Sequence, residues 1–311
     1  MLNGDRVVRW PCGSRRFVQG AIVLASAGIV AWAAALPLLT RQAINCRVTS
    51  RPIPLYLKGL EFLLRDAEYR RLAAEISRGL TTDAARAMTL ARWTSGHIRP
   101  TPGGWPVVDD HVLHIIIRGY GEADQVADVF TTLAAYAGIP AFWKIVRART
   151  GDGVAVLTFA RIDGRWTVWD VRRGIAFTNA RGVLAGVEEL RANPALIEAA
   201  VGAVTYADQP YRFFVEDGIA SLQIPRPLRA YQQMPGPRVL FEAQRLWQRW
   251  RGGADSAALN GAGMSRDGAD RDARLESRPP FRIYCTAHSR CICYTRRLNQ
   301  IRRSMAHLRI G

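Results

Sequence analysis

The chain has 311 residues, enough for one or two domains with a substantial core, and its apolar content of 49% is ordinary for a globular protein. The net charge of +17 is not ordinary, and arginine supplies all of the basic residues except Lys58 and Lys144. A basic chain can bind nucleic acid or anionic lipid, but the arginines are scattered and no helix-turn-helix, zinc-finger or RNA-recognition signature is present. We therefore expect no nucleic-acid partner.

An uncharged apolar run at residues 17–40 follows a basic N-terminal segment. At about 1.5 Å per residue, a helix over this run is long enough to cross a hydrocarbon core of about 30 Å. Three interpretations remain open: a single-pass membrane anchor, a secretory signal cut near Ala33-Ala34-Ala35, and a buried helix. We expect the anchor. Arginines flank both ends, so the positive-inside rule does not fix the side, and we favour the periplasm of a bacterium for the remainder of the chain.

Residues 51–98 have the pattern of helices. Four leucines give the first helix an apolar stripe: Leu57, Leu60, Leu63 and Leu64. Gly79 ends the charged continuation of that helix, and Thr81-Thr82-Asp83 predicts the N-terminal cap of another. We expect these helices to pack against a core helix that begins near residue 123.

A short polar cluster follows a loop at residues 99–106, which proline and glycine predict. Its members are Asp109, Asp110, His111 and His114. These residues have the chemistry of metal ligands, and the two histidines share one face if the segment is helical but not if it is extended. We favour surface carboxylates and capping histidines beside a buried segment, and expect no metal and no other cofactor.

The core helix is predicted after the Gly119-Tyr120-Gly121 entry. Its buried face comes from residues spaced i, i+4, i+7 and i+11: Val126, Phe130, Leu133 and Ala137. Gly138 is the residue type that follows a helix C-terminus, and Pro140 prevents the helix from continuing.

A β-hairpin is predicted next. An apolar, β-branched strand runs over residues 154–162, Asp163-Gly164 favours a two-residue type I′ turn, and residues 165–169 return. This turn places Ile162 opposite Arg165, and the same count places Asp170 opposite Leu157.

These segments contain an ordered set of residues: Gly121, Ala127, Gly138-Ile139-Pro140-Ala141, Asp163-Gly164 with Trp166, and Asp170. The set resembles the core of the transglutaminase-like superfamily, a papain-like fold. The resemblance covers about fifty residues closely and implies an α+β fold in which helices pack on a small antiparallel sheet. It also implies a Cys-His-Asp triad for acyl transfer or amide hydrolysis, with the cysteine position at residue 123.

The triad positions are degenerate: Ala123 for the cysteine, Leu157 for the histidine, and Asp170. A thiolate at a helix N-terminus is stabilised by unpaired N–H groups, but alanine has no nucleophile. Ala155 and Phe159, which share the face of Leu157, are apolar too. We expect Asp170 to be a carboxylate that ends a strand and bonds to nearby backbone or to a following arginine, Arg172 or Arg173.

Beyond the hairpin we predict a strand at residues 175–177, short helices at 183–191 and 194–201, and a strand at 211–215. Residues 239–250 predict an amphipathic helix that either closes the domain or lies on a membrane, and closing a domain is the commoner use.

The chain is expected to divide into a basic N-terminus with its anchor (1–50), a transglutaminase-like domain (51–250) and a basic disordered tail (251–311). The tail contains Cys285, His288, Cys291 and Cys293, whose spacing does not match the usual C-x2-C pairs of zinc sites.

The preferred interpretation is a degenerate, non-catalytic binding or scaffold protein at the membrane, whose partner is a protein or an envelope polymer. The alternative is an amide-bond hydrolase or acyl transferase with a rearranged site that uses Glu122, Asp124, His111 or His114. A third is a membrane-bound structural partner in an envelope or polysaccharide system.

Overall fold

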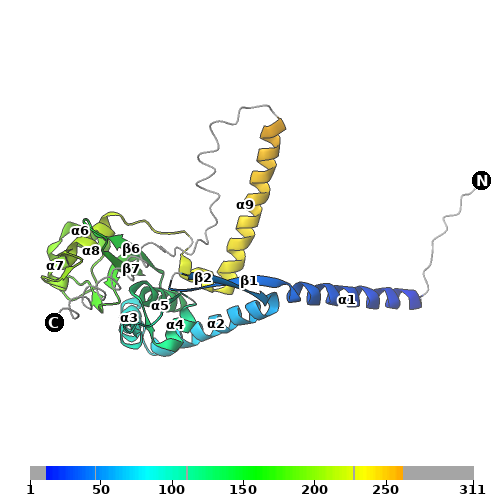
Figure 1. The fold of residues 1–311 in the computed structure, drawn as a ribbon, viewed down its shortest axis with the longest axis horizontal. Helices are drawn as coiled ribbons and strands as arrows, with labels where there is room; N and C mark the ends of the chain where they lie inside the picture. The colour runs from blue at the N-terminus through cyan, green and yellow to red at the C-terminus, as the bar shows by residue number, and fades with distance from the viewer. Residues whose placement is uncertain (1–11, 46, 110, 227, 262–311) are drawn as a thin grey trace, which may run out of the picture. The chain divides into compact units, whose positions relative to one another are not determined.

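The computed structural model describes residues 12–45, 47–109, 111–226 and 228–261 (Figure 1). Asp110 and the tail residues Cys285, His288, Cys291 and Cys293 lie outside this part. The chain divides into two compact units, the first made of Met1–Arg41 and Thr49–Leu63 and the second of Gln42–Val48 and Leu64–Gly311.

Helix α1 (Cys12–Ala35) lies in the first unit, whereas strands β1 (Pro37–Ile44) and β2 (Arg47–Pro54) are divided between the two units. The predicted span of residues 17–40 is too long, because the helix ends at Ala35. Pro37 disfavours helical geometry in the residue before it and opens β1 instead. Within α1, Phe17–Ala35 is long and apolar enough to cross a membrane. Within the described residues none of this run is buried, as an anchor or a secretory signal would require.

Helix α2 (Leu55–Ile76) starts in the first unit and ends in the second. The predicted leucine stripe is present but uncovered, since Leu57, Leu60, Leu63 and Leu64 are all exposed. Burial begins further along the helix, at Arg65, Tyr69 and Ala73. The expected packing on the core helix is confirmed for the C-terminal part of α2, where Tyr69 contacts Tyr136 of the core helix with ring centroids 5.4 Å apart, but the leucine stripe takes no part in it.

The second unit is built on a four-stranded antiparallel sheet in the order β6-β7-β8-β9. Its strands are β6 (Ala141–Arg147), β7 (Val154–Ile162), β8 (Arg165–Asp170) and β9 (Ile175–Ala176). The predicted hairpin register is confirmed, with Ile162 opposite Arg165. Asp163 and Gly164 both have positive φ angles, as a type I′ turn requires.

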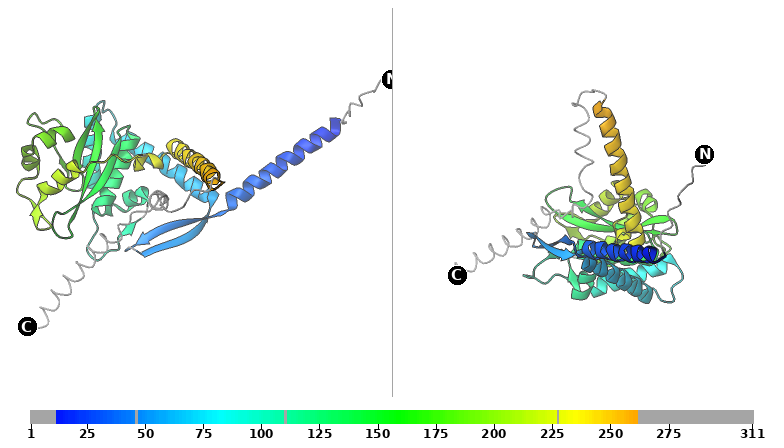
Figure 2. Two further views of the ribbon diagram at one scale, coloured as in Figure 1. Left: turned by 90° about the horizontal axis from the view of Figure 1, so that it is seen from above. Right: turned by 90° about the vertical axis from the view of Figure 1, so that its right-hand side faces the viewer.

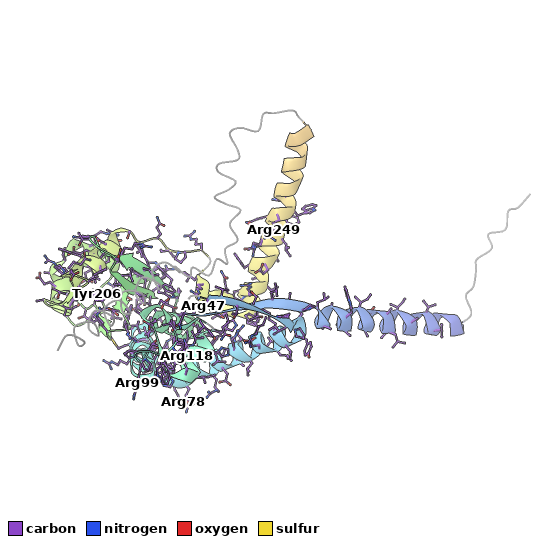
Figure 3. All side chains as sticks on the ribbon, in the orientation of Figure 1. Arg47, Arg78, Arg99, Arg118, Tyr206 and Arg249 are labelled. Carbon is purple, nitrogen blue, oxygen red and sulfur yellow. The ribbon has the colours of Figure 1, made fainter. Side chains whose placement is uncertain are left out.

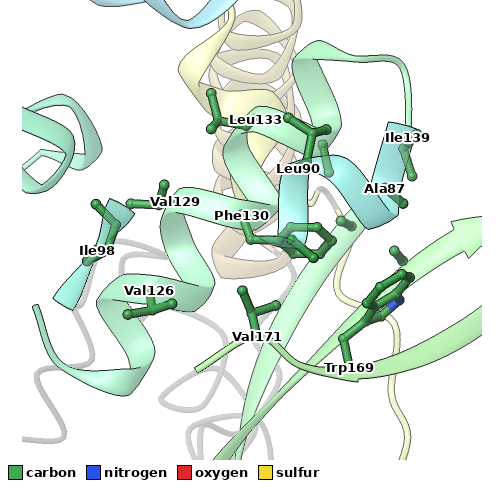
Figure 4. Packing of buried hydrophobic residues seen from close by; sticks show 14 of the residues in the cluster. Ala87, Leu90, Ile98, Val126, Val129, Phe130, Leu133, Ile139, Trp169 and Val171 are labelled. Carbon is green, nitrogen blue, oxygen red and sulfur yellow. The ribbon is translucent and has the colours of Figure 1, made fainter. Parts of the chain in front are cut away.

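Helix α5 (Ala123–Tyr136) covers one face of this sheet, and Phe130 contacts Trp169 with ring centroids 5.8 Å apart (Figure 4). Helices α3 (Asp83–His97) and α4 (Val112–Arg118) pack against α5 as well, so α5 is buried on nearly every side. Thr82 caps α3 as predicted, and its side-chain oxygen accepts the N–H of Ala85 at 3.2 Å. Helix α5 ends at the predicted place, since its C-cap Ala137 is followed by Gly138 with a φ of 84°.

The opposite face of the sheet is covered by α6 (Val187–Ala192), α7 (Ala195–Val201) and α8 (Tyr211–Ala220) (Figures 1 and 2). Residues 211–215, predicted as a strand, form the start of α8, and that prediction is wrong. The buried residues of α8 recur at helical spacing: Tyr211, Phe214, Val215, Gly218 and Ile219. They pack on Leu157, Phe159 and Val168 of β7 and β8.

The remaining elements are short, except the last. They are β3 (Arg99–Pro100), β4 (Val108–Asp109), β5 (Tyr120–Gly121), β10 (Thr205–Tyr206), β11 (Gln209–Pro210) and the 3₁₀ helix η1 (Arg229–Gln233). Helix α9 (Pro235–Gly261) continues past the boundary expected at residue 250, because Gly252 and Gly253 are tolerated inside it. The described chain is α+β, with helices packed on a small antiparallel sheet, as the resemblance implied.

Gly218 allows α8 to approach the sheet closely. A Cβ at this position would lie 2.5 Å from Cδ1 of Leu157 and 3.1 Å from Cγ2 of Val146. We expect Gly218→Ala to lower the free energy of unfolding by about 1–2 kcal/mol, because overpacking costs more than the gain in helix propensity. Gly96, which has open space around it in α3, is the control: Gly96→Ala should stabilise by up to about 1 kcal/mol in the same urea titration.

Candidate functional site

The N-terminus of α5 is closed by its own side chains. Glu122 is the N-cap and forms a capping box with Gln125, whose Oε1 accepts the Glu122 N–H at 3.1 Å. A Cβ on Gly121 would lie 2.9 Å from the same oxygen, which explains the glycine. Ala123, the first helical residue, is half-buried. A methyl group there offers no nucleophile, and the capping box already supplies an acceptor for the N–H of Gln125.

Gln125 is itself fixed by its surroundings. Its side-chain amide donates to the carbonyl of Val108, and Arg118 donates to Gln125 Oε1 at 3.1 Å and to Val108 at 2.9 Å. Figure 3 labels Arg118 in this part of the second unit. The start of α5 is therefore tied by the hydrogen bonds of Gln125 to Val108 and to Arg118.

Asp170 ends β8 and is 1% exposed. Its Oδ1 accepts the backbone N–H of Arg173 at 3.0 Å, and its Oδ2 accepts from Arg173 Nη1 at 2.8 Å. The hydroxyl of Tyr211, from α8, donates to Oδ2 as well. The predicted bond to a following arginine is confirmed, with Arg173 as the partner. Both carboxylate oxygens are committed to holding β8, the turn after it and α8 together.

Arg173 and Tyr211 also contact each other. The guanidinium carbon of Arg173 lies 4.1 Å from the ring centroid of Tyr211 and 4.8 Å from that of Tyr206. Burial, together with the negative charge of Asp170, raises the pKa of Tyr211 above its ordinary value. Tyr211 is therefore a neutral donor at physiological pH, and its proton stays on the bond to Asp170.

Asp170 and Ala123 belong to different faces of the sheet. Successive side chains of a strand point to opposite faces, and Trp169 contacts Phe130 of α5. Asp170 accordingly points to the α8 face, where it meets Tyr211. Leu157 is fully buried in the cluster on that same face. The structure thus brings Leu157 and Asp170 together under α8, while Ala123 starts the helix on the other side.

The predicted pairing of Asp170 with Leu157 is not part of the β7–β8 ladder, which runs from Ile162 opposite Arg165 to Thr158 opposite Trp169. The register of the observed pairs is the one that the turn predicts, but the β7–β8 ladder ends one pair before Asp170. On the other edge of β8, Asp170 pairs with Ile175 of β9.

Arg172 lies between the start of α5 and the end of β8. Its Nη1 donates to the carbonyl of Gly121 at 3.3 Å. Burial lowers the pKa of Arg172, while the charges of Glu122 and Asp170 raise it, so both carboxylates act on this side chain. The group between the start of α5 and the end of β8 is therefore a guanidinium, which remains protonated in proteins and cannot act as a general base at neutral pH.

The residues of a rearranged site have partners of their own. His111 precedes α4 and His114 lies within it, with ring centroids 5.9 Å apart, so the helical alternative for this segment is the one observed. Asp124 is 8% exposed, and its Oδ1 accepts the N–H of Gln125 at 3.0 Å. Within the described part of the chain, no group of three or more His, Cys, Asp or Glu residues could hold a metal ion.

A surface hollow of ≈ 610 Å³ lies near the turn end of β8, lined in part by Trp166, Asn179, Glu188 and Glu189. No sequence signal predicts this hollow, since its lining residues lie on separate segments and form no motif. Glu189 accepts from Asn179 at 3.0 Å, and Glu188 forms an ion pair with Arg191. The residues that line the hollow do not include Ala123, Leu157 or Asp170.

Alkaline pH should weaken the fold through Tyr211. The folded-state pKa is raised, so its contribution to stability is complete below about pH 10 and is lost as the pH rises above that, by up to about 1.4 kcal/mol per pH unit. Tyr136 acts in the same direction, because burial and a hydrogen bond to Asp66 raise its pKa. Urea titrations at about pH 9 and about pH 11 should show a smaller loss for Tyr211→Phe than for wild type. Equal losses would contradict this assignment.

No family model and no curated protein matches the chain. Among solved structures it is similar to a proposed cysteine protease from Cytophaga hutchinsonii, at 15% identity and a TM-score of 0.31 over 38% of this chain and 40% of that one. It is also similar to a proposed protease from Parabacteroides distasonis (12%, 0.28, covering 42% and 35%). A third is described as a TGase (11%, 0.29, covering 72% and 59%). The chain spans less than two thirds of the length of each of these proteins.

Proposed function

We propose that this chain is a non-catalytic binding or scaffold protein at a membrane, built on a degenerate transglutaminase-like domain. The observation that carries the proposal is the state of Asp170. Its carboxylate is buried, accepts from Arg173 and Tyr211, and points away from the helix that bears Ala123. Of the three triad positions that the resemblance implies, Ala123 replaces the cysteine and Leu157 replaces the histidine. The third, Asp170, holds neighbouring elements together.

Restoring catalysis would require Asp170 to leave its partners. Breaking a buried, hydrogen-bonded charge pair costs about 3–5 kcal/mol, and orienting an imidazole would have to recover that cost. General acid–base catalysis contributes roughly 10²–10⁴ in rate, and within the described residues the hydrogen bonds of Asp170 go to Arg173 and Tyr211 rather than to an imidazole. This geometry supports a role in which the domain binds a partner without catalysing a reaction.

The location in the proposal comes from α1. The run Phe17–Ala35 is apolar enough to cross a bilayer, and we propose that it anchors the domain on the periplasmic side of a bacterial envelope. The partner would be an envelope protein or polymer. Co-purification after mild detergent extraction, followed by mass spectrometry, would identify it.

The catalytic part of the proposal is tested with the full chain in detergent, a glutamine-containing peptide and a primary amine. Mass spectrometry should find neither cross-linked nor deamidated peptide above the protein-free control. Wild-type turnover would overturn the proposal and favour a hydrolase or acyl transferase with a rearranged site. Glu122→Gln and His114→Gln would then locate that site, with Asp152→Ala at an exposed loop position as the control.

Ala123→Cys is expected to stay at the background rate in the same assay. The new thiol would stand in the first turn of α5, where the helix dipole favours the thiolate, but no imidazole would accompany it. Alkylation of the peptide that contains residue 123 would show that the thiol is reachable, as its half-buried position predicts. Acyl transfer by this variant alone would show that a base is present after all.

A further inference from the structure

The apolar side of α9 faces outward. Val239, Leu246 and Trp250 recur at i, i+7 and i+11, which places them on one side of the helix, and Leu240 and Trp247 extend that side. Their exposed fractions run from 54% for Trp247 to 68% for Trp250. This set of five residues is called the α9 apolar face.

The opposite side of α9 is the less exposed one and carries Phe241 together with Glu242 and Arg245, which are all half-exposed. At the start of the helix, Arg238 Nη1 donates to Gln232 of η1 at 3.3 Å. Helix α9 packs against η1 through this end. A helix that closes a domain has the reverse arrangement, with the apolar side covered. The expectation that α9 closes the domain is therefore not met by the described residues.

The composition of the helix identifies what would cover this face. Between residues 235 and 251, α9 has four arginines and one glutamate. Arg251 lies over the ring of Trp247 at 4.9 Å, and Arg249 projects from the same helix (Figure 3). Tryptophan beside arginine suits the headgroup layer of a bilayer, where the indole spans the apolar boundary and the cation meets lipid phosphate.

We propose that the α9 apolar face lies in the interfacial layer of an anionic lipid bilayer, as a second membrane contact separate from α1. The inference rests on the proposed function in one respect, that the chain resides at a membrane. A helix of this type lies in the plane of the interface, with its apolar side about 5–10 Å into the headgroup and acyl boundary. The excess of arginine makes the contact depend on anionic lipid, since each basic residue near such a surface gains from its potential.

The test uses the full chain reconstituted in vesicles of phosphatidylcholine with phosphatidylglycerol, in which the upper acyl chains carry bromine. Bromine quenches nearby indoles, so wild type should lose more fluorescence than Trp247→Phe/Trp250→Phe. Both substitutions keep an apolar ring, so the fold is retained. Trp105→Phe, which removes an exposed tryptophan outside α9, is the matched control and should leave the quenched signal of wild type in place. Omitting phosphatidylglycerol, or introducing Arg249→Gln/Arg251→Gln, should reduce the α9 component by about three-fold or more.

Equal quenching of wild type and Trp247→Phe/Trp250→Phe would overturn the proposal. Quenching that appears only after residues 262–311 are deleted would assign the face to the chain's own tail, and loss of a dimer in sedimentation with the double variant would assign it to a second copy. Either result would also overturn it. Failure of the anchor is distinguishable, because the full chain would then leave the vesicles in high salt, whereas failure of this inference leaves it bound with unquenched Trp247 and Trp250.

Discussion

Asp170→Ala is expected to lower the free energy of unfolding by about 3 kcal/mol, the low end of the range for breaking a buried pair. The low end applies because the Arg173 side chain is 32% exposed and can turn to water. Tyr211, unlike Arg173, cannot turn to water, because it is fully buried and its hydroxyl would lose its acceptor. An unsatisfied buried hydroxyl costs about 1–3 kcal/mol by itself.

Urea titration of the full chain in detergent, followed by tryptophan fluorescence, measures the effect. Asp152→Ala, at an exposed loop carboxylate, should change stability by less than about 0.5 kcal/mol. Tyr211→Phe alone should cost about 1 kcal/mol, because Asp170 keeps its bonds to Arg173. In the double variant the two losses should not add, since both remove the same bond. An Asp170→Ala chain as stable as Asp152→Ala would show that the carboxylate is not a structural tie.

The parts of the fold that the sequence predicted are those set by local chemistry. Asp163-Gly164 fixes a two-residue turn, and that turn fixes the register of the strands on either side. Gly138 and Pro140 similarly mark the end of α5. The start of α8 was mispredicted because residues 211–215 alone are rich in strand-forming types. The helical period becomes visible only when Gly218 and Ile219 are included.

The candidate site divides in the same way. The sequence alone shows that position 123 has no nucleophile, because this depends on one residue type at one position. Only one partner of Asp170 could be predicted from the sequence. Arg173 is three residues away, whereas Tyr211 is forty-one residues away on a helix that was predicted as a strand. Long-range partners of this kind require knowledge of which helix covers which face of the sheet.

The apolar stripes of α2 and α9 show a second limit of prediction from the sequence. Periodicity identified the α2 leucines and the α9 apolar face correctly as single faces of helices. It says nothing about what covers them, and in both helices the described residues leave the stripe exposed. For α9 the accompanying arginines and tryptophans supply the missing information; for α2 the structure shows no comparable chemistry.

Deleting residues 1–36 should release the chain from membranes. The deletion ends before Pro37 because β1 pairs with β4 through Ala43 and Ile44, and that pairing belongs to the second unit. After carbonate treatment and flotation on a density gradient, the full chain should float with the lipid and the deletion should remain at the bottom. Flotation is preferable to pelleting, since the alkaline loss of stability expected from Tyr211 would also pellet aggregates.

A substitution tests the same helix without shortening the chain. Val23→Arg with Ile29→Arg places two charges near the centre of the span, and each costs about 2.5–3.5 kcal/mol of insertion free energy. The pair should abolish flotation, whereas the matched control Val23→Leu with Ile29→Leu should float as wild type does. N-terminal sequencing separates the two interpretations of α1, because an anchored chain keeps its first residues and a secretory signal is removed near Ala33-Ala34-Ala35. A wild-type chain that starts after residue 35 and stays in the soluble fraction would end the anchor hypothesis.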